Sequence, residues 1–283
     1  MTNILEAIIN IVTNPILNIK NHYSGRNRAN NIGEALETFV KDAFANTIQA
    51  SDELTRMAKY NEVFSWLGNQ NHPPDIMIRN GDAIEVKKTQ SVNSDLALNS
   101  SYPKSNIQSN SNMITQDCKN CEEWIEKDLI YCVGHTDDDI VNSLWMVYGN
   151  IYAAKHETYQ IIKKKITDGI NEIPNVELAL TNELGRVNRV DPLGITNLRI
   201  RGMWQIQNPR RVFNYLHLQS DNKFELVAII PTEKYNSFPN ESKNKIEKLG
   251  NENLVMKNIQ VKDPNNPANL IEAKLIVFKV TEK

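Results

Sequence analysis

The chain has 283 residues, of which 40% are hydrophobic and 23% are charged, the composition of an ordinary globular protein. Its 32 Lys and Arg residues against 34 Asp and Glu residues give a net charge of −2, so any binding of nucleic acid has to rest on a local basic patch. No apolar run reaches about 18 residues, which excludes a membrane-spanning helix, and segment 4–19 lacks the basic leader of a signal peptide. We therefore expect a cytoplasmic protein.

The spacing of apolar residues predicts an α/β fold with a mixed central sheet, helices on it and additional C-terminal strands. We expect one domain, 1–283, with a core at about 1–180 and further strands in about 181–283. Segments 91–122 and 236–269 are polar; the first is predicted to be a long loop and the second a loop with a short helix. The predicted helices span 4–20, 31–48 and 154–171, and the predicted strands span 75–79, 83–88, 128–134, 144–150, 197–207, 212–218, 224–230 and 270–280.

The second predicted helix carries acidic residues beside its apolar stripe. Glu37 lies at the edge of that stripe, whereas Glu34 lies further round, toward solvent. A carboxylate at the edge of a buried face can reach a neighbouring sheet, although both glutamates can equally be solvated. The stripe consists of Ile32, Leu36, Phe39, Val40 and Ala43.

The first two predicted strands carry two carboxylates and a lysine in the run PDIMIRNGDAIEVKK. Glu85 and Lys87 share one face of their strand because side chains alternate. Asp75 and Glu85 repel each other when side by side unless a cation separates them, and Mg²⁺ suits such a pair of oxygen ligands. With a lysine to position water, the pattern indicates metal-assisted phosphodiester hydrolysis, although a solvated hairpin can match it by chance.

The turn between these strands predicts their register. A three-residue loop at 79–81 pairs Ile78 with Asp82 and brings Asp75 opposite Glu85, whereas a two-residue loop would place the carboxylates on opposite faces. Three-residue hairpin loops usually contain one residue in the left-handed backbone conformation, and we expect Gly81 to be that residue.

The polar segment after the hairpin contains LALNSSYPKSNI. Its hydroxyls and the ammonium group of Lys104 suit contact with a phosphate near the cleaved bond, with Ser100 as a further candidate. A solvated polar loop is the alternative.

The chain has three cysteines, an odd number that argues against a disulfide framework. A zinc site of three cysteines and one histidine is a weak alternative, because residues three apart on a strand face opposite ways. The residues concerned are Cys118, Cys121, Cys132 and His135.

Six of the ten arginines fall between 186 and 211, a window with no lysine and with Asp191 as its one acidic residue. Arginine forks match the O6 and N7 acceptors of guanine in the major groove, and Arg199 and Arg201 share one face of a predicted strand. Phosphates or structural carboxylates are the alternative partners. The six are Arg186, Arg189, Arg199, Arg201, Arg210 and Arg211.

Taken together, GEALETFVKD, PPDIMIRNGDAIEVKK, LALNSSYPKSNI, KDLIYCVG and GRVNRVDPLGITNLRIRGMW resemble the NgoPII family of type II restriction endonucleases. The PD-(D/E)xK part is common to many nucleases, whereas the run from 185 to 204 points to this family. The resemblance covers most of the chain, to at least residue 213.

The resemblance implies a restriction-endonuclease-like fold and a Mg²⁺-dependent enzyme that cuts double-stranded DNA at GGCC. Asp75, Glu85 and Lys87 would be catalytic, with Glu37, or else Glu34, as an upstream acidic residue. Asp75, Glu85 and the Val86 carbonyl would hold the metal. A palindromic site is matched most simply by a two-fold homodimer. A structure-selective or repair nuclease of the same fold, or a DNA-binding module without catalysis, are the alternatives.

Overall fold

The computed structural model describes residues 2–24, 32–69, 72–98, 100–218 and 222–281. Its centre is a mixed sheet of nine strands, in which eight run in the order β1-β2-β3-β6-β7-β12-β14-β13 and β5 pairs with β6. The pairs β3–β6 and β7–β12 are parallel and the other pairs are antiparallel. The expected α/β fold, consistent with the restriction-endonuclease-like class, is thus confirmed.

The strands of this sheet are β1 (Phe64–Trp66), β2 (Ile76–Ile78), β3 (Ala83–Thr89), β5 (Asn106–Gln108), β6 (Glu126–Asp137), β7 (Ile140–Tyr148), β12 (Phe224–Pro231), β13 (Leu254–Lys262) and β14 (Leu270–Val280). β12 is buried along its whole length, as expected for an inner strand flanked by β7 and β14. The C-terminal strands therefore belong to the same sheet as the predicted hairpin.

The helices around the sheet are α1 (Ile4–Thr13), α2 (Ile19–Ser24), α3 (Ile32–Ala45), α4 (Glu53–Val63), α5 (Gln116–Lys119), α7 (Pro209–Val212), α8 (Thr232–Ser237), α9 (Asn240–Leu249) and the 3₁₀ turns η1 (Gly149–Ile151) and η2 (Asn214–Leu216). The predicted stripe of α3 is buried at four of its five positions, and α3 packs on α1 and on the strands β3 and β6. Contact is so close that a Cβ atom on Gly134 of β6 would lie 2.6 Å from Leu36 Cδ2. None of the described helices is long and apolar enough to cross a membrane.

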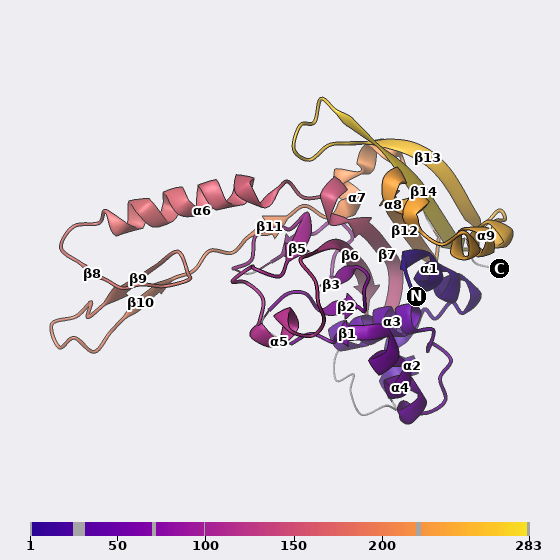
Figure 1. Cartoon of the computed structure of the whole chain (residues 1–283), viewed down its shortest axis with the longest axis horizontal. Coiled ribbons are helices and arrows are strands. Elements are labelled where there is room, and N and C mark those ends of the chain that lie inside the picture. The colour runs from indigo at the N-terminus through magenta and orange to yellow at the C-terminus, as the bar shows by residue number, and fades with distance from the viewer. Residues whose placement is uncertain (1, 25–31, 70–71, 99, 219–221, 282–283) are drawn as a thin grey trace.

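An arm projects from this body (Figure 1). It consists of α6 (His156–Asn171) and a small antiparallel sheet of β8 (Glu177–Leu178), β9 (Gly185–Asn188) and β10 (Leu198–Ile200). Helix and sheet meet around Gly185, where a Cβ atom would lie 2.7 Å from Ile170 Cγ2. The arm returns to the body through β11 (Gln205–Ile206), which pairs with β4 (Leu96–Ala97).

Several sequence predictions were wrong. Segment 212–218 holds the end of α7 and the turn η2 rather than a strand. Helix α7 begins here because the Asn208 side chain accepts from the Arg210 N–H and Pro209 occupies the first turn. Segment 254–262 is strand β13 rather than a loop, and 4–20 breaks into two helices around Pro15. Helix α4 was not predicted, although Asp52 caps its first turn.

Candidate active site

The hairpin of β2 and β3 has the predicted register. Ile76 pairs with Ile84 and Met77 with Ala83, which continues to Asp75 opposite Glu85. The three-residue loop is closed by the Ile78 N–H, which donates to the Asp82 carbonyl at 2.9 Å. Both carboxylates therefore lie on one face of the sheet.

The prediction that Gly81 adopts the left-handed conformation was wrong. Asn80 has the positive φ, 54°, and asparagine is among the side chains that tolerate this region. Gly81 is needed for space instead, because a Cβ atom there would lie 2.8 Å from Ile78 Cγ2. Lys127 also stabilises the loop, because its Nζ donates to the carbonyls of Ile78 (3.1 Å) and Gly81 (2.7 Å).

Asp75, Glu85 and Lys87 form one cluster. Lys87 Nζ lies 2.6 Å from Glu85 Oε1 and 3.9 Å from Asp75 Oδ2. The backbone N–H of Val86 donates to Asp75 Oδ2 at 2.7 Å, which fixes the Asp75 side chain against the neighbouring strand. The three predicted catalytic residues are thus brought together.

Electrostatics in the cluster favour an additional cation. Burial and the Glu85 carboxylate raise the pKa of Asp75 to about 7, and Lys87 and the Val86 N–H offset this only in part. Burial lowers the pKa of Lys87, but the Glu85 and Asp75 carboxylates outweigh it and leave that pKa raised. Glu85 Oε2 is buried with no hydrogen-bond partner among the described residues. A buried carboxylate oxygen without a donor is the kind of group that a hard divalent ion satisfies.

Of the two glutamates on α3, Glu37 lies nearer the cluster. Its carboxylate contributes to raising the pKa of Asp75 and of Lys87. It also forms an ion pair of 2.6 Å with Lys41. Glu34 is exposed and is not among the main causes of either pKa shift.

Lys104 lies near the same cluster. Its side chain is buried, and its Nζ donates to Ser101 Oγ and to the Tyr102 carbonyl. Burial lowers the pKa of Lys104 to about 8, with Glu85 opposing and Lys87 adding to the shift. Ser100, in contrast, is exposed.

Tyr131 positions Lys104 and was missed at the sequence level. Tyr131 on β6 pairs with Glu85 on β3. Its hydroxyl accepts from the Lys104 N–H at 2.8 Å and donates to the Lys104 carbonyl at 3.2 Å. Nothing in the local sequence marks this residue, because its role depends on strand pairing.

An aromatic cluster joins the loop of Lys104 to the base of the arm. Tyr102 stacks on Tyr159 of α6 with a centroid distance of 5.6 Å, and both rings meet the Trp204 ring edge-on at 6.0 and 5.7 Å. The Leu98 N–H donates to the Trp204 carbonyl at 2.9 Å. Both ends of the arm therefore contact the segment that carries Lys104.

The arginines do not form one patch. Arg199 pairs with Arg186 across β10 and β9, on the sheet face opposite Val187 and Leu198. Arg199 and Arg201 both bind Glu183, at 2.7 and 2.5 Å, and Arg189 binds Glu177 at 2.5 Å. The carboxylates lie outside the window 186–211, so the local positive charge is smaller than the window suggests.

The last two arginines lie on α7, back on the body. Arg211 forms an ion pair of 2.8 Å with Asp95. Arg210 is half-buried and lies close enough to His135 to lower the pKa of that imidazole, although burial contributes more.

The zinc alternative finds no support. In the described part of the chain, no group of three or more His, Cys, Asp or Glu side chains is placed to hold a metal. Cys118 Sγ lies 3.3 Å from Met77 Sδ, and Cys121 Sγ donates to the Cys118 carbonyl. Cys132 is buried within β6.

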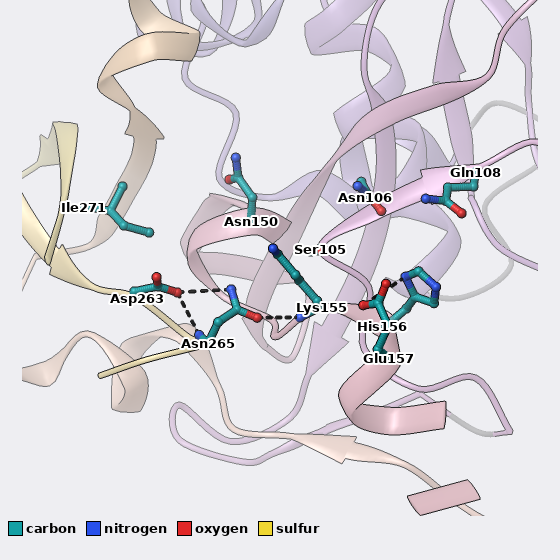
Figure 2. A pocket seen from close by; sticks show the side chains of 10 residues that line it. All are labelled: Ser105, Asn106, Gln108, Asn150, Lys155, His156, Glu157, Asp263, Asn265 and Ile271. Atoms are coloured by element: carbon teal, nitrogen blue, oxygen red, sulfur yellow. Dashed lines mark hydrogen bonds and ion pairs between the residues drawn. The ribbon is translucent and has the colours of Figure 1, made fainter. Parts of the chain in front are cut away.

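A polar cavity of about 380 Å³ lies elsewhere, between the start of α6 and the turn from β13 to β14 (Figure 2). Asn265 Oδ1 accepts from the Lys155 N–H at 2.8 Å, and Asp263 Oδ1 accepts from Asn265. Asp75, Glu85 and Lys87 do not line it. The lining residues are Ser105, Asn106, Gln108, Asn150, Lys155, His156, Glu157, Asp263, Asn265 and Ile271.

The family model described as NgoPII restriction endonuclease matches residues 2–262. A curated relative, type II restriction enzyme NgoPII from Neisseria gonorrhoeae, is 49% identical over 278 residues, which covers 98% of this chain and 99% of the relative. No solved structure matches the chain.

Proposed function

The chain belongs to the NgoPII restriction endonuclease family, and we propose that this type II restriction enzyme hydrolyses double-stranded DNA with Mg²⁺ held between Asp75 and Glu85. The observation that carries the proposal is the buried pair itself. Burial and the neighbouring Glu85 carboxylate raise the pKa of Asp75, and Glu85 Oε2 has no hydrogen-bond partner among the described residues.

The donor set fits Mg²⁺. Two carboxylates and the Val86 carbonyl are hard oxygen ligands, and Mg²⁺ ordinarily takes one or two carboxylates and fills its remaining positions with water and substrate phosphate. When bound, Mg²⁺ supplies Lewis-acid stabilisation of the charge that develops on the phosphate.

The remaining groups orient the reactants. Lys87 stays protonated beside its two carboxylates, so its ammonium group acts as a hydrogen-bond donor that positions the attacking water. The Val86 N–H keeps Asp75 from rotating away. Lys104, held by Tyr131, adds positive charge on the same side as Glu85 and contacts the phosphate next to the cleaved bond. Glu37, on α3, adds a negative charge near the cluster and so helps to raise the pKa of Asp75 and of Lys87.

The arginine face of the arm contacts DNA. Arg199 on β10 and Arg201, one residue beyond its end, are both paired with Glu183 and present two forks, which suit two adjacent guanines of a GGCC site. Glu183 holds both forks in the absence of DNA and is displaced when guanine binds. Arg186, Arg189, Arg210 and Arg211, with Ser100, contact the backbone. Two copies of the chain, each cutting one strand, match the two-fold symmetry of the palindrome.

A plasmid digest with mapped ends tests the proposal. Wild-type enzyme with Mg²⁺ should give discrete fragments that end within GGCC. Lys87→Ala should abolish cutting, whereas Lys88→Ala, one residue along and on the other face of β3, should retain it. Cutting only at flaps or junctions would indicate a structure-selective nuclease, and a band shift without cutting would indicate a DNA-binding module; either result contradicts the proposal.

A further inference from the structure

The arm concentrates exposed aliphatic side chains. Fifteen large hydrophobic residues are exposed in the described part of the chain, and ten of them lie between 161 and 198. Leu180, Leu193 and Ile195 are the most exposed of these, at 104, 81 and 76%. Helix α6 itself has no buried residue. Isolated exposed hydrophobic residues are normal, but a concentration on one projecting element marks an interaction surface.

The loop at the distal end of the arm (Figure 1) is held in a defined conformation. The Gly194 N–H donates to the Asp191 carbonyl at 2.8 Å, and Gly194 has a φ of +69°. The Asp191 side chain accepts from the Leu193 N–H at 3.0 Å and from the Thr196 N–H at 2.6 Å. Leu193 and Ile195 are therefore presented to solvent by a structured turn, and a surface that is already ordered costs less entropy to bind.

In the small sheet of the arm, the aliphatic residues and the arginines lie on opposite faces. In the small sheet, Leu198 pairs with Val187 and Ile200 with Gly185, on the face toward α6. Arg186 and Arg199 are the intervening pair and face the other way. The small sheet thus has a basic face and an apolar face, which suits a segment with two different partners.

We propose that the apolar residues of the arm bind a second copy of this chain, so that the arm forms the dimer contact while its arginine face is left for DNA. This inference rests on the proposed function, because cutting both strands of a palindrome calls for two sites related by two-fold symmetry. DNA itself is a poor occupant, since its grooves offer phosphates and polar base edges, with the thymine methyl group as the main apolar feature.

The apolar area is of the size that a dimer needs. By their exposed fractions, the ten side chains are together equivalent to about six fully exposed ones, which is on the order of 350–700 Å² of apolar surface. A standard interface buries about 800 Å² per partner, of which roughly 60% is apolar, or about 480 Å².

The test is the mass of the protein in solution. Wild-type protein should sediment as a dimer, twice 32.3 kDa. The double variant Leu193→Glu/Ile195→Glu should dissociate at least about a hundredfold more readily, because the dimer would bring like charges together at its contact. The control Leu54→Glu/Ile125→Glu changes two residues that are 84 and 85% exposed on the body and should remain dimeric. All four positions are exposed, so loss of folding does not confuse the comparison.

A second readout separates this inference from the proposed function. The arm variant should convert supercoiled plasmid to nicked circles with Mg²⁺ rather than to linear DNA, while the control still gives linear DNA. A monomeric wild type that cuts both strands, or an arm variant that stays dimeric and loses only DNA affinity, would overturn the inference. A wild type that is dimeric through the arm but does not cut would overturn the proposed function alone.

Discussion

Replacing Asp75 by asparagine should stabilise the metal-free protein. Asp75 is a buried carboxylate opposite a second one, and its pKa is raised to about 7 from the ordinary value of about 3.9. Because the raised pKa belongs to the folded state, ionisation opposes folding, and this cost grows as the pH rises from about 4 to about 7 and is constant above that. Asparagine has no charge to bury and can still accept the hydrogen bond from the Val86 N–H.

The magnitude follows from the shift. One pKa unit corresponds to about 1.4 kcal/mol, so the variant should gain roughly 1.5 kcal/mol at pH 5 and up to about 4 kcal/mol above pH 7. Lys87 loses one negative neighbour in the variant, which reduces the gain. For a chain of this size, each kcal/mol raises the Tm by about 2–4 °C.

The assay is urea unfolding in EDTA at pH 5 and pH 8. Asp52→Asn is the control, because hydrogen bonds from Thr55 lower the pKa of Asp52, so loss of that charge should not stabilise the protein at either pH. At 100 times its Kd, Mg²⁺ should add about 2.7 kcal/mol to the wild type and little to Asp75→Asn, which reverses the ranking at pH 5 and narrows the difference at pH 8. An Asp75→Asn protein that is no more stable at pH 8 than the wild type in EDTA would refute the account of the carboxylate pair.

Three further predictions concern DNA. Lys104 has a pKa lowered to about 8 by burial, so metal-free DNA affinity measured by fluorescence anisotropy should fall by up to about tenfold per unit above pH 8, and Lys104→Met should remove this dependence; a slope that persists in the variant would exclude the contact. Glu183→Gln should release the forks of Arg199 and Arg201 and strengthen binding to every sequence at low salt; weaker binding in a filter assay would show that Glu183 orders the forks for recognition. Trp204→Leu should lower the single-turnover cleavage rate more than the DNA affinity, because it reaches Lys104 through Tyr102; equal losses in both would contradict that link.

The hairpin could be predicted because its features are local. Alternation along a strand and the length of the turn suffice to place Asp75 opposite Glu85, and the structure has that register. The left-handed residue was misassigned because both Asn80 and Gly81 tolerate positive φ, and the close approach of Ile78 to Gly81 is not visible in sequence. Local signals for α7 and β13 are present in the sequence, as an Asn-Pro cap and as apolar residues that recur through 254–262.

What could not be predicted depends on pairing between distant segments. Tyr131 matters because β6 pairs with β3, and the partners of Arg199 and Arg189 come from residues outside the arginine-rich window. The arm is the largest part of the fold that the sequence did not predict. Helical spacing predicts that 154–171 is a helix, but only the three-dimensional arrangement shows that the helix leaves the body and exposes its aliphatic side chains.

The most direct test of the metal site is a crystal of the enzyme soaked in Mn²⁺, with anomalous scattering recorded at the manganese edge. The account predicts a peak between the Asp75 and Glu85 carboxylates, in contact with Glu85 Oε2, and its loss in Glu85→Gln. A peak at the cavity lined by Asp263 and Glu157, or no peak under conditions where the same Mn²⁺ supports cleavage, would contradict it.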